Sequence, residues 1–238
     1  MTRADGRGYD ELRPVELIRD YVKFAEGSVL IRCGDTVVLC NASVEEKIPP
    51  HVAEGHGWVT AEYSMLPRAN RQRSRRDIDK LKLNGRSAEI QRLIGRSLRA
   101  AVDMEALGER TVTVDCDVLQ GDGGTRTASI TGGFVALALA CRRLMEEGKV
   151  MRNPIVHQVA AVSAGIVEDR AVLDLPYSED SRAQVDLNCV MNERGELIEI
   201  QGTGEGRSFT LSEQQELVRL CAKGIRELMD KQREILKP

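Results

Sequence analysis

The stretch from about Thr125 to Glu147 constrains the fold of this 238-residue chain more than any other. Its length predicts a helix. The residues in its middle are small and apolar: Ala128, Gly132, Gly133, Ala136 and Ala138. Because such a helix brings its backbone close to its neighbours, we expect it to pack tightly against a sheet or another helix. The longest unbroken apolar run, Phe134–Cys141, is far shorter than the ~20 residues that cross a membrane, so we expect no membrane partner.

Runs of β-branched residues surround that helix and predict two groups of strands. Before the helix, two runs flank a Gly34-Asp35 turn in a hairpin pattern, and a later run alternates cleanly between apolar and polar residues. The strands predicted before the helix cover Val29–Cys33, Thr36–Cys40, Trp58–Met65 and Thr111–Val118. Those predicted after it cover Val156–Val167, Ala171–Leu175, Val185–Met191 and Leu197–Gln201.

Two further helices are predicted, over about Ser87–Ala106 and about Ser212–Ile235. The first has apolar residues at helical spacing, and Gly108 follows its end. The second begins at Ser212, a residue type that favours the N-cap position. The order of elements predicts an α+β fold: one domain over residues 1–238 with mixed β-sheets packed against about three long helices.

The cysteines and the N-terminus indicate where such a protein works. None of the six cysteines lies in a C-x-x-C pair or at zinc-ligand spacing from a histidine, so we expect buried thiols in a reducing compartment. Residues 1–7 lack the apolar core of a signal peptide. The expected location is cytoplasmic.

Positive charge is concentrated between Pro67 and Arg99. Eleven basic and three acidic residues give this stretch a net charge of +8, which leaves −11 for the rest of a chain whose total is −3. Residues 67–84 have no periodicity, and we interpret them as a long exposed loop. The stretch is either a solvated surface or a site that collects phosphates, and the charge pattern alone does not choose between the two.

A glycine-rich turn, Gly121–Gly124, joins a predicted strand to the central helix. Glycines allow backbone amides to face a ligand, and the first turn of a helix offers unpaired N–H donors and partial positive charge. Thr125 adds a hydroxyl and Arg126 a planar fork for phosphate oxygens. The alternative is a tight turn without a ligand. Because no Gly-Lys-Ser/Thr follows, the turn is not a P-loop.

Two carboxylates near the predicted strand Val185–Met191 form a second candidate site. Asp186 and Asn188 share one face of that strand, opposite its apolar side chains, and Asp180 precedes Asp186 by six residues. Together the two acids can present oxygens to a hard cation such as Mg²⁺. The alternative is a pair of solvated acids close to a turn.

These strings, and others along the chain, resemble the ribonuclease PH family. The similar segments run from Arg3-Ala4-Asp5-Gly6-Arg7 through Asn84-Gly85-Arg86 and Asp117–Ile130 to Leu173–Asn188 and Glu199–Glu205. They cover essentially the whole chain in order. The resemblance implies a phosphate-dependent 3′→5′ exoribonuclease, a phosphorolytic nucleotidyltransferase that trims tRNA precursor 3′ ends, with rRNA or RNA turnover as further roles. It releases nucleoside diphosphates reversibly.

The resemblance also implies roles for individual residues. Inorganic phosphate, the co-substrate, is expected at Arg86, Gly124, Thr125 and Arg126, and a Mg²⁺ or Mn²⁺ ion at Asp180 and Asp186. Arg126, Asp180 and Asp186 are expected to serve catalysis. RNA is expected to contact Arg68, Arg73 and Arg76 in the loop and Arg92, Arg96 and Arg99 on the following helix. The family forms homohexameric rings.

Three other functions are weighed against this one. A catalytically inactive RNA-binding subunit of a ring assembly would not need Arg86, Arg126, Asp180 and Asp186, yet all four are present. An unrelated RNA-binding module would leave the glycine turn and the carboxylates unexplained. A nucleotide hydrolase would be expected to carry the P-loop lysine, which is missing.

Overall fold

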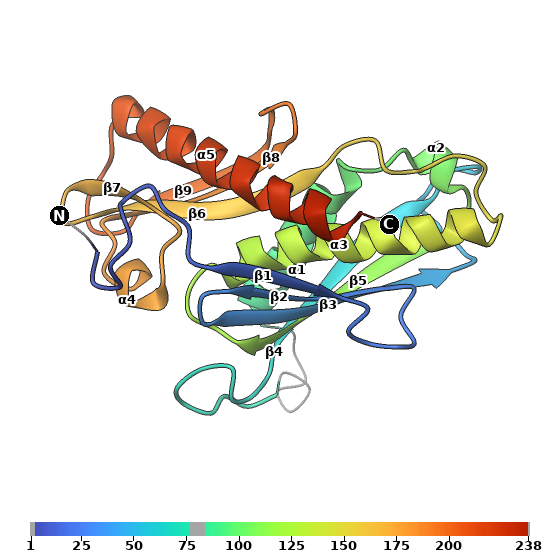
Figure 1. The fold of residues 1–238 in the computed structure, drawn as a ribbon, viewed down its shortest axis with the longest axis horizontal. Coiled ribbons are helices and arrows are strands. Elements are labelled where there is room, and N and C mark those ends of the chain that lie inside the picture. The colour runs from blue at the N-terminus through green and yellow to red at the C-terminus, as the bar shows by residue number, and fades with distance from the viewer. Residues whose placement is uncertain (1–2, 77–83, 238) are drawn as a thin grey trace.

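Two β-sheets enclose a central helix in the computed structural model, which describes residues 3–76 and 84–237 (Figure 1). The first sheet has the strand order β1-β2-β3-β5-β4. Its strands are β1 (Val15–Arg19), β2 (Gly27–Cys33), β3 (Thr36–Glu45), β5 (Thr111–Gln120) and β4 (Trp58–Met65). All of its pairs are antiparallel except β4 with β5, which run parallel. The α+β fold with mixed sheets is therefore confirmed.

The second sheet is antiparallel and has the order β7-β6-β8-β9. Its strands are β7 (Arg170–Leu173), β6 (Val159–Val167), β8 (Val185–Asn192) and β9 (Leu197–Gly204). Between β7 and β8 lies a one-turn helix, α4 (Tyr177–Asp180), which the sequence patterns did not predict. Strand β1 was not predicted either, since its five residues show no alternation in burial.

Helix α3 (Thr125–Glu146) is the core helix that its small residues predicted. It packs on β2 and β3 of the first sheet and on β6 of the second. A Cβ added to Gly132 would lie 2.7 Å from Ile31 and 3.0 Å from Cys40, so glycine is what allows this close approach. α3 is long and apolar enough to cross a membrane, but most of it is buried between the sheets, as a core helix is. One domain over residues 1–238 stays a prediction.

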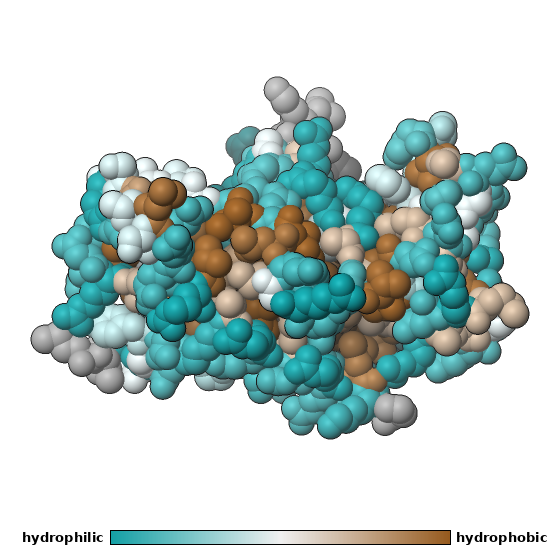
Figure 2. Space-filling model, turned by 90° about the horizontal axis from the view of Figure 1, so that it is seen from above, coloured by the Kyte–Doolittle hydropathy of each residue, from teal (hydrophilic) through white to brown (hydrophobic). Residues whose placement is uncertain are grey.

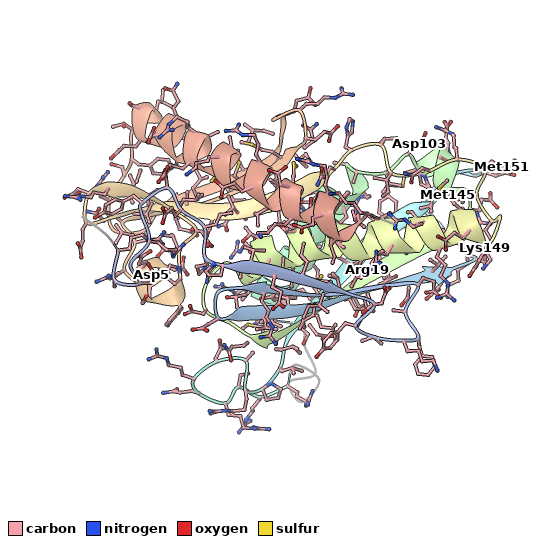
Figure 3. The ribbon with its side chains drawn as sticks, viewed as in Figure 1. Asp5, Arg19, Asp103, Met145, Lys149 and Met151 are labelled. Atoms are coloured by element: carbon pink, nitrogen blue, oxygen red, sulfur yellow. The ribbon has the colours of Figure 1, made fainter. Side chains whose placement is uncertain are left out.

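The long helix α5 (Leu211–Ile235) covers the second sheet and also contacts β1. It begins one residue before the predicted Ser212, because Thr210 and Glu213 form a reciprocal capping box there. At its other end, Arg19 donates to the carbonyls of Ile235 and Lys237 (Figure 3). The face of the molecule that carries α5, seen from above in Figure 2, is mostly hydrophilic, with hydrophobic side chains toward its middle.

Helix α1 (Gly85–Arg99) is shorter than the predicted Ser87–Ala106. The chain leaves the helix after Ala100, and Val102 forms a β-bridge with Ile155. Asp103 then caps a separate short helix, α2 (Met104–Leu107), by accepting from the amides of Glu105 and Ala106. An aspartate with an extended backbone starts a helix and does not continue one, so the prediction of a single helix was wrong. With α1, α3 and α5, the expectation of three long helices is confirmed.

Candidate active site

The glycine turn lies at the edge of the first sheet where β4 and β5 both end. Gly123 and Gly124 have φ angles of +76° and +66°, a conformation that favours glycine. Thr36 holds the turn: its hydroxyl donates to the Gly123 carbonyl at 2.7 Å and accepts from the Asp122 amide at 2.9 Å. Gly124 is the N-cap of α3 and has no side chain to cap the helix, and no acid lies in the first turn. The start of this 22-residue helix can therefore receive an anion.

Thr125 and Arg126 are the first two residues of α3. The Thr125 hydroxyl is 2.8 Å from the Tyr63 hydroxyl on β4. The Arg126 guanidinium donates to Gln201 on β9 at 3.2 Å and lies 3.8 Å from Glu89 on α1. Burial raises the pKa of Tyr63, and the positive charges of Arg86 and Arg126 oppose that rise. Both arginines therefore lie close to one buried hydroxyl.

Asp180 ends α4 and Asp186 is the second residue of β8. Burial raises the pKa of Asp180, Arg86 lowers it, Glu205 raises it and Arg126 lowers it. Burial, followed by the charge of Asp180, raises the pKa of Asp186 to about 6. The structure thus brings together Arg86, Arg126, Asp180 and Asp186 from four different elements.

The two carboxylates suit a divalent cation. Burial raises the pKa of both acids and the charge of Asp180 further raises the pKa of Asp186, so a positive ion beside them would oppose both effects. Mg²⁺ commonly takes one or two carboxylates and completes its shell with water and substrate phosphate. Within residues 3–76 and 84–237, no group of three or more His, Cys, Asp and Glu side chains is arranged to hold a metal. The donor set therefore fits a cation shared with a phosphorylated substrate.

The basic loop after β4 is fixed to the glycine turn at its base. Ala69 is buried, and its carbonyl accepts from the Gly121 amide at 2.9 Å. Arg68, Arg73 and Arg76 are exposed, and Arg68 donates to the Arg71 carbonyl. The rest of the predicted loop, residues 77–83, lies outside the described part of the chain.

The three arginines predicted to contact RNA from α1 have different surroundings. Arg92 is exposed. Arg96 is exposed too, and makes two hydrogen bonds to Glu199 on β9, at 3.0 and 2.7 Å. Arg99 is half-buried: its guanidinium carbon lies 4.4 Å from the centre of the Trp58 ring, and it donates to the Val59 carbonyl at 2.9 Å. Protein contacts therefore already engage Arg96 and Arg99, and RNA contact by this helix stays a prediction.

Sequence patterns missed some residues around the site. Tyr63 could have been found, since it lies on the apolar, inward face of a predicted strand that leads to the basic loop. Arg13 and Asp174 could not, because 161 residues separate them and no local pattern links them.

Comparisons with known proteins agree with this geometry. Residues 11–142 match domain 1 of the 3′ exoribonuclease family, and residues 157–223 match domain 2. The chain is 55% identical over 236 residues to ribonuclease PH of Bacillus mycoides and 54% identical to that of Bacillus subtilis. Both alignments cover 98% of this chain and 96% of the relative.

Solved structures share the fold. A chain of the Archaeoglobus fulgidus exosome with RNA bound to the active site superposes with a TM-score of 0.83 at 25% identity, over 97% of this chain and 92% of that one. Rice Rrp46 superposes with a TM-score of 0.80 at 18% identity, over 99% of this chain and 100% of that one, which shows the fold alone. From the relatives and both family matches, this chain belongs to the ribonuclease PH family of 3′ exoribonucleases.

Proposed function

We infer that the protein is a phosphate-dependent 3′→5′ exoribonuclease that removes nucleotides from RNA 3′ ends as nucleoside diphosphates. One observation carries the assignment of the site: the positive charges of Arg86 and Arg126 both act on Asp180, although these residues come from three separate elements. An anion site beside a pair of carboxylates is what phosphorolysis of a phosphodiester needs. The inactive-subunit alternative has no need for this arrangement.

The protein's own groups mainly bind and orient the reactants. Arg86, Arg126, the Thr125 hydroxyl and the amides at the start of α3 would hold inorganic phosphate. A phosphate oxygen forms a bond to the phosphorus of the last phosphodiester, and the bond from that phosphorus to the 3′-oxygen of the preceding nucleotide breaks. The 3′-oxygen takes a proton, so the products are a nucleoside diphosphate and an RNA one nucleotide shorter. The reaction replaces a phosphodiester bond with the phosphoanhydride bond of the nucleoside diphosphate, and it therefore runs backwards when nucleoside diphosphate is abundant.

Asp180 and Asp186 would hold Mg²⁺ or Mn²⁺. When bound, such an ion supplies positive charge beside the reacting phosphate groups. The charge of Asp180, which raises the pKa of Asp186, supports this placement because it shows that the two carboxylates lie near each other. Arg126 opposes the rise in the pKa of both acids and so favours the ionised form that a cation requires.

The preferred substrate is proposed to be the 3′ end of tRNA precursors, held by Arg68, Arg73 and Arg76 at the base of the site. The fixed link from Ala69 to Gly121 supports this, because it holds the start of the basic loop next to the phosphate site. We further propose a homohexameric ring, supported by the likeness to an archaeal exosome core. A cytoplasmic location is supported by the six cysteines, all of them buried free thiols.

The test follows nucleoside diphosphate release from a tRNA with extra 3′ nucleotides. Asp180→Asn should lower the rate about 100-fold or more, because it weakens the hold on the cation whose positive charge would stabilise the transition state, and the loss of such stabilisation costs that much. Asp230→Asn, on the exposed face of α5, is the matched control and should leave the rate unchanged. Without phosphate, trimming should stop. Continued trimming with release of nucleoside monophosphates would identify a hydrolase and overturn the assignment.

A further inference from the structure

The N-terminal segment before β1 crosses to the other half of the molecule and places two arginines in its interior. Arg3 and Arg13 are each only 6% exposed. A buried guanidinium is costly unless charged and polar groups satisfy it fully. Both arginines are satisfied. Their partners belong to the segment that leads to Asp180, to the glycine turn beside the site, or to the N-terminal segment itself.

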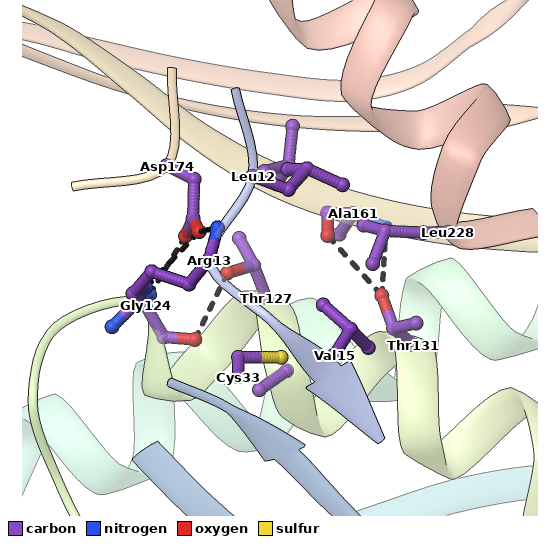
Figure 4. A pocket seen from close by; sticks show the side chains of 12 residues that line it. Leu12, Arg13, Val15, Cys33, Gly124, Thr127, Thr131, Ala161, Asp174 and Leu228 are labelled. Carbon is purple, nitrogen blue, oxygen red and sulfur yellow. Dashed lines mark hydrogen bonds and ion pairs between the residues drawn. The ribbon is translucent and has the colours of Figure 1, made fainter. Parts of the chain in front are cut away.

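Arg13 joins the Asp180 side of the site to the glycine turn. Its Nε and Nη2 donate to the two carboxylate oxygens of Asp174 at 3.0 and 2.7 Å, and its backbone amide donates to the same carboxylate at 2.7 Å. Its Nη1 reaches the Asp122 carbonyl at 2.5 Å, and Nη2 reaches the Gly123 carbonyl at 3.4 Å. Figure 4 shows this side chain between Asp174 and Gly124.

Asp174 is held in an unusual state by these contacts. Its φ of +53° is uncommon for a residue other than glycine. Burial would raise its pKa, but the charge and hydrogen bonds of Arg13, aided by Arg7, hold the pKa below its ordinary value. The ionised carboxylate of Asp174 therefore depends on the Arg13 guanidinium, whereas the Asp174 carbonyl accepts from Arg3 and Arg7.

Arg3 holds the other end of that segment. Its Nε and Nη2 donate to the two oxygens of Glu179 at 3.1 and 2.5 Å, and Nη1 and Nη2 also donate to the carbonyls of Leu173 and Asp174. Glu179 immediately precedes Asp180 on α4. The N-terminal segment lies next to α4 at one end of the molecule, where Figure 3 labels Asp5.

We propose that Arg3 and Arg13 are positioning residues for the active site, an inference that rests on the proposed function. Arg3 fixes α4, and with it Asp180, through Glu179. Arg13 fixes the distance between the Asp174 segment and the glycine turn that would bind phosphate. Because both side chains are buried and bonded to protein groups, neither is expected to contact the substrate. The two residues differ in what they hold, so their loss should be distinguishable.

The experiment compares Glu179→Gln, Arg3→Lys and Arg13→Lys with the wild type and with Glu216→Gln, which alters a matched but exposed bidentate pair with Arg219. Binding of Mn²⁺ alone is measured by electron paramagnetic resonance of the free ion, KM for phosphate by nucleoside diphosphate release, and folding by thermal melting. Glu179→Gln and Arg3→Lys should raise the Kd for Mn²⁺ about tenfold, since groups that orient metal ligands have effects of that size. Their KM for phosphate should change less than twofold. Arg13→Lys should raise both constants.

A merely structural role would not produce this difference between the effects on the Kd for Mn²⁺ and on the KM for phosphate. If Arg13→Lys does not fold, the two milder variants still decide the role of Arg3, and Asp174→Asn, which removes the charge that pairs with Arg13, decides the role of Arg13 by the same two constants. Folded Glu179→Gln and Arg3→Lys proteins that bind Mn²⁺ like the wild type would overturn the inference and leave the proposed function intact. A wild type that neither binds Mn²⁺ nor needs phosphate would overturn both. Glu216→Gln should match the wild type in all three measurements, and a tenfold weaker affinity for Mn²⁺ in that variant would also refute the inference.

Discussion

Replacing Gly123 with alanine tests how tightly the two halves of the active site fit together. Gly123 lies against the segment that follows Asp174: an added Cβ would lie 2.9 Å from the Tyr177 nitrogen and closer still to the Leu175 carbonyl oxygen. Real Cβ atoms essentially never approach backbone atoms so closely. Neither side can give way easily, because Thr36 and Arg13 hold the glycine turn and Arg13 also holds Asp174.

The expected cost has two parts. The φ of +76° costs about 1–2 kcal/mol for an L-residue, and forcing an extra carbon into a packed site costs about 1–3 kcal/mol more. Gly195 separates the two parts. Its φ is +77°, but nothing lies within 4 Å of a Cβ added there, so Gly195→Ala should cost only the first ~1–2 kcal/mol.

The assay is thermal melting of both variants at one protein concentration, with KM for phosphate measured beside it. In a domain of this size ~1 kcal/mol lowers Tm by about 2–4 °C. Gly123→Ala should therefore melt at least about 2 °C below Gly195→Ala, and its KM for phosphate should rise while that of Gly195→Ala stays at the wild-type value. If the two variants melt together and bind phosphate equally well, the tight fit between the turn and the Tyr177 segment is refuted.

Two other substitutions probe single groups. Tyr63→Phe removes the hydroxyl beside Thr125, so KM for phosphate should rise about 2–10-fold, the equivalent of one hydrogen bond of ~0.5–1.5 kcal/mol; an unchanged KM would place phosphate elsewhere. Asp117→Asn should raise Tm by about 1–2 °C at pH 7.5, which is equivalent to ~0.5 kcal/mol at this half-exposed site. Burial and Glu62 raise the pKa of Asp117, so its ionised form is unfavourable in the folded state and its removal should stabilise the protein. Melting from pH 7.5 downward checks the sign: the advantage should fade as the pH drops through the raised pKa toward 3.8, where the folded and unfolded wild type both bind the proton.

Local patterns predicted the elements that carry the site. The alternation of Thr111–Val118 and the small residues after Thr125 placed the glycine turn between a strand and a core helix, which the structure confirms. The predicted helix boundaries were wrong where a capping residue determines where the helix begins. Asp103 starts a separate helix inside the predicted Ser87–Ala106, and Thr210 starts another before Ser212, because a capping side chain outweighs periodicity at a helix end.

Contacts between distant segments were beyond such patterns. The approach of Arg86 and Arg126 to Asp180 was a hypothesis that periodicity could not derive, since it depends on how α1, α3 and α4 pack. The pairing of Arg13 with Asp174 was not anticipated at all. From its sequence context, an arginine near the N-terminus is expected to lie on the surface. Only the tertiary structure shows that it is buried and which acid pairs with it.

The parallel pairing of β4 with β5 sets how the arginine-rich loop lies relative to the glycine turn that is proposed to bind phosphate. Met65 is in register with Val118, so the chain enters the arginine-rich loop and the glycine turn from the same height on the sheet. Lengthening β4 by two residues would keep its side chains on their faces yet carry the arginines about 7 Å further along the strand direction. That distance is close to one nucleotide step of an extended strand, so in the proposed site the length of β4 would set the spacing between the arginines proposed to bind RNA and the bond that is broken.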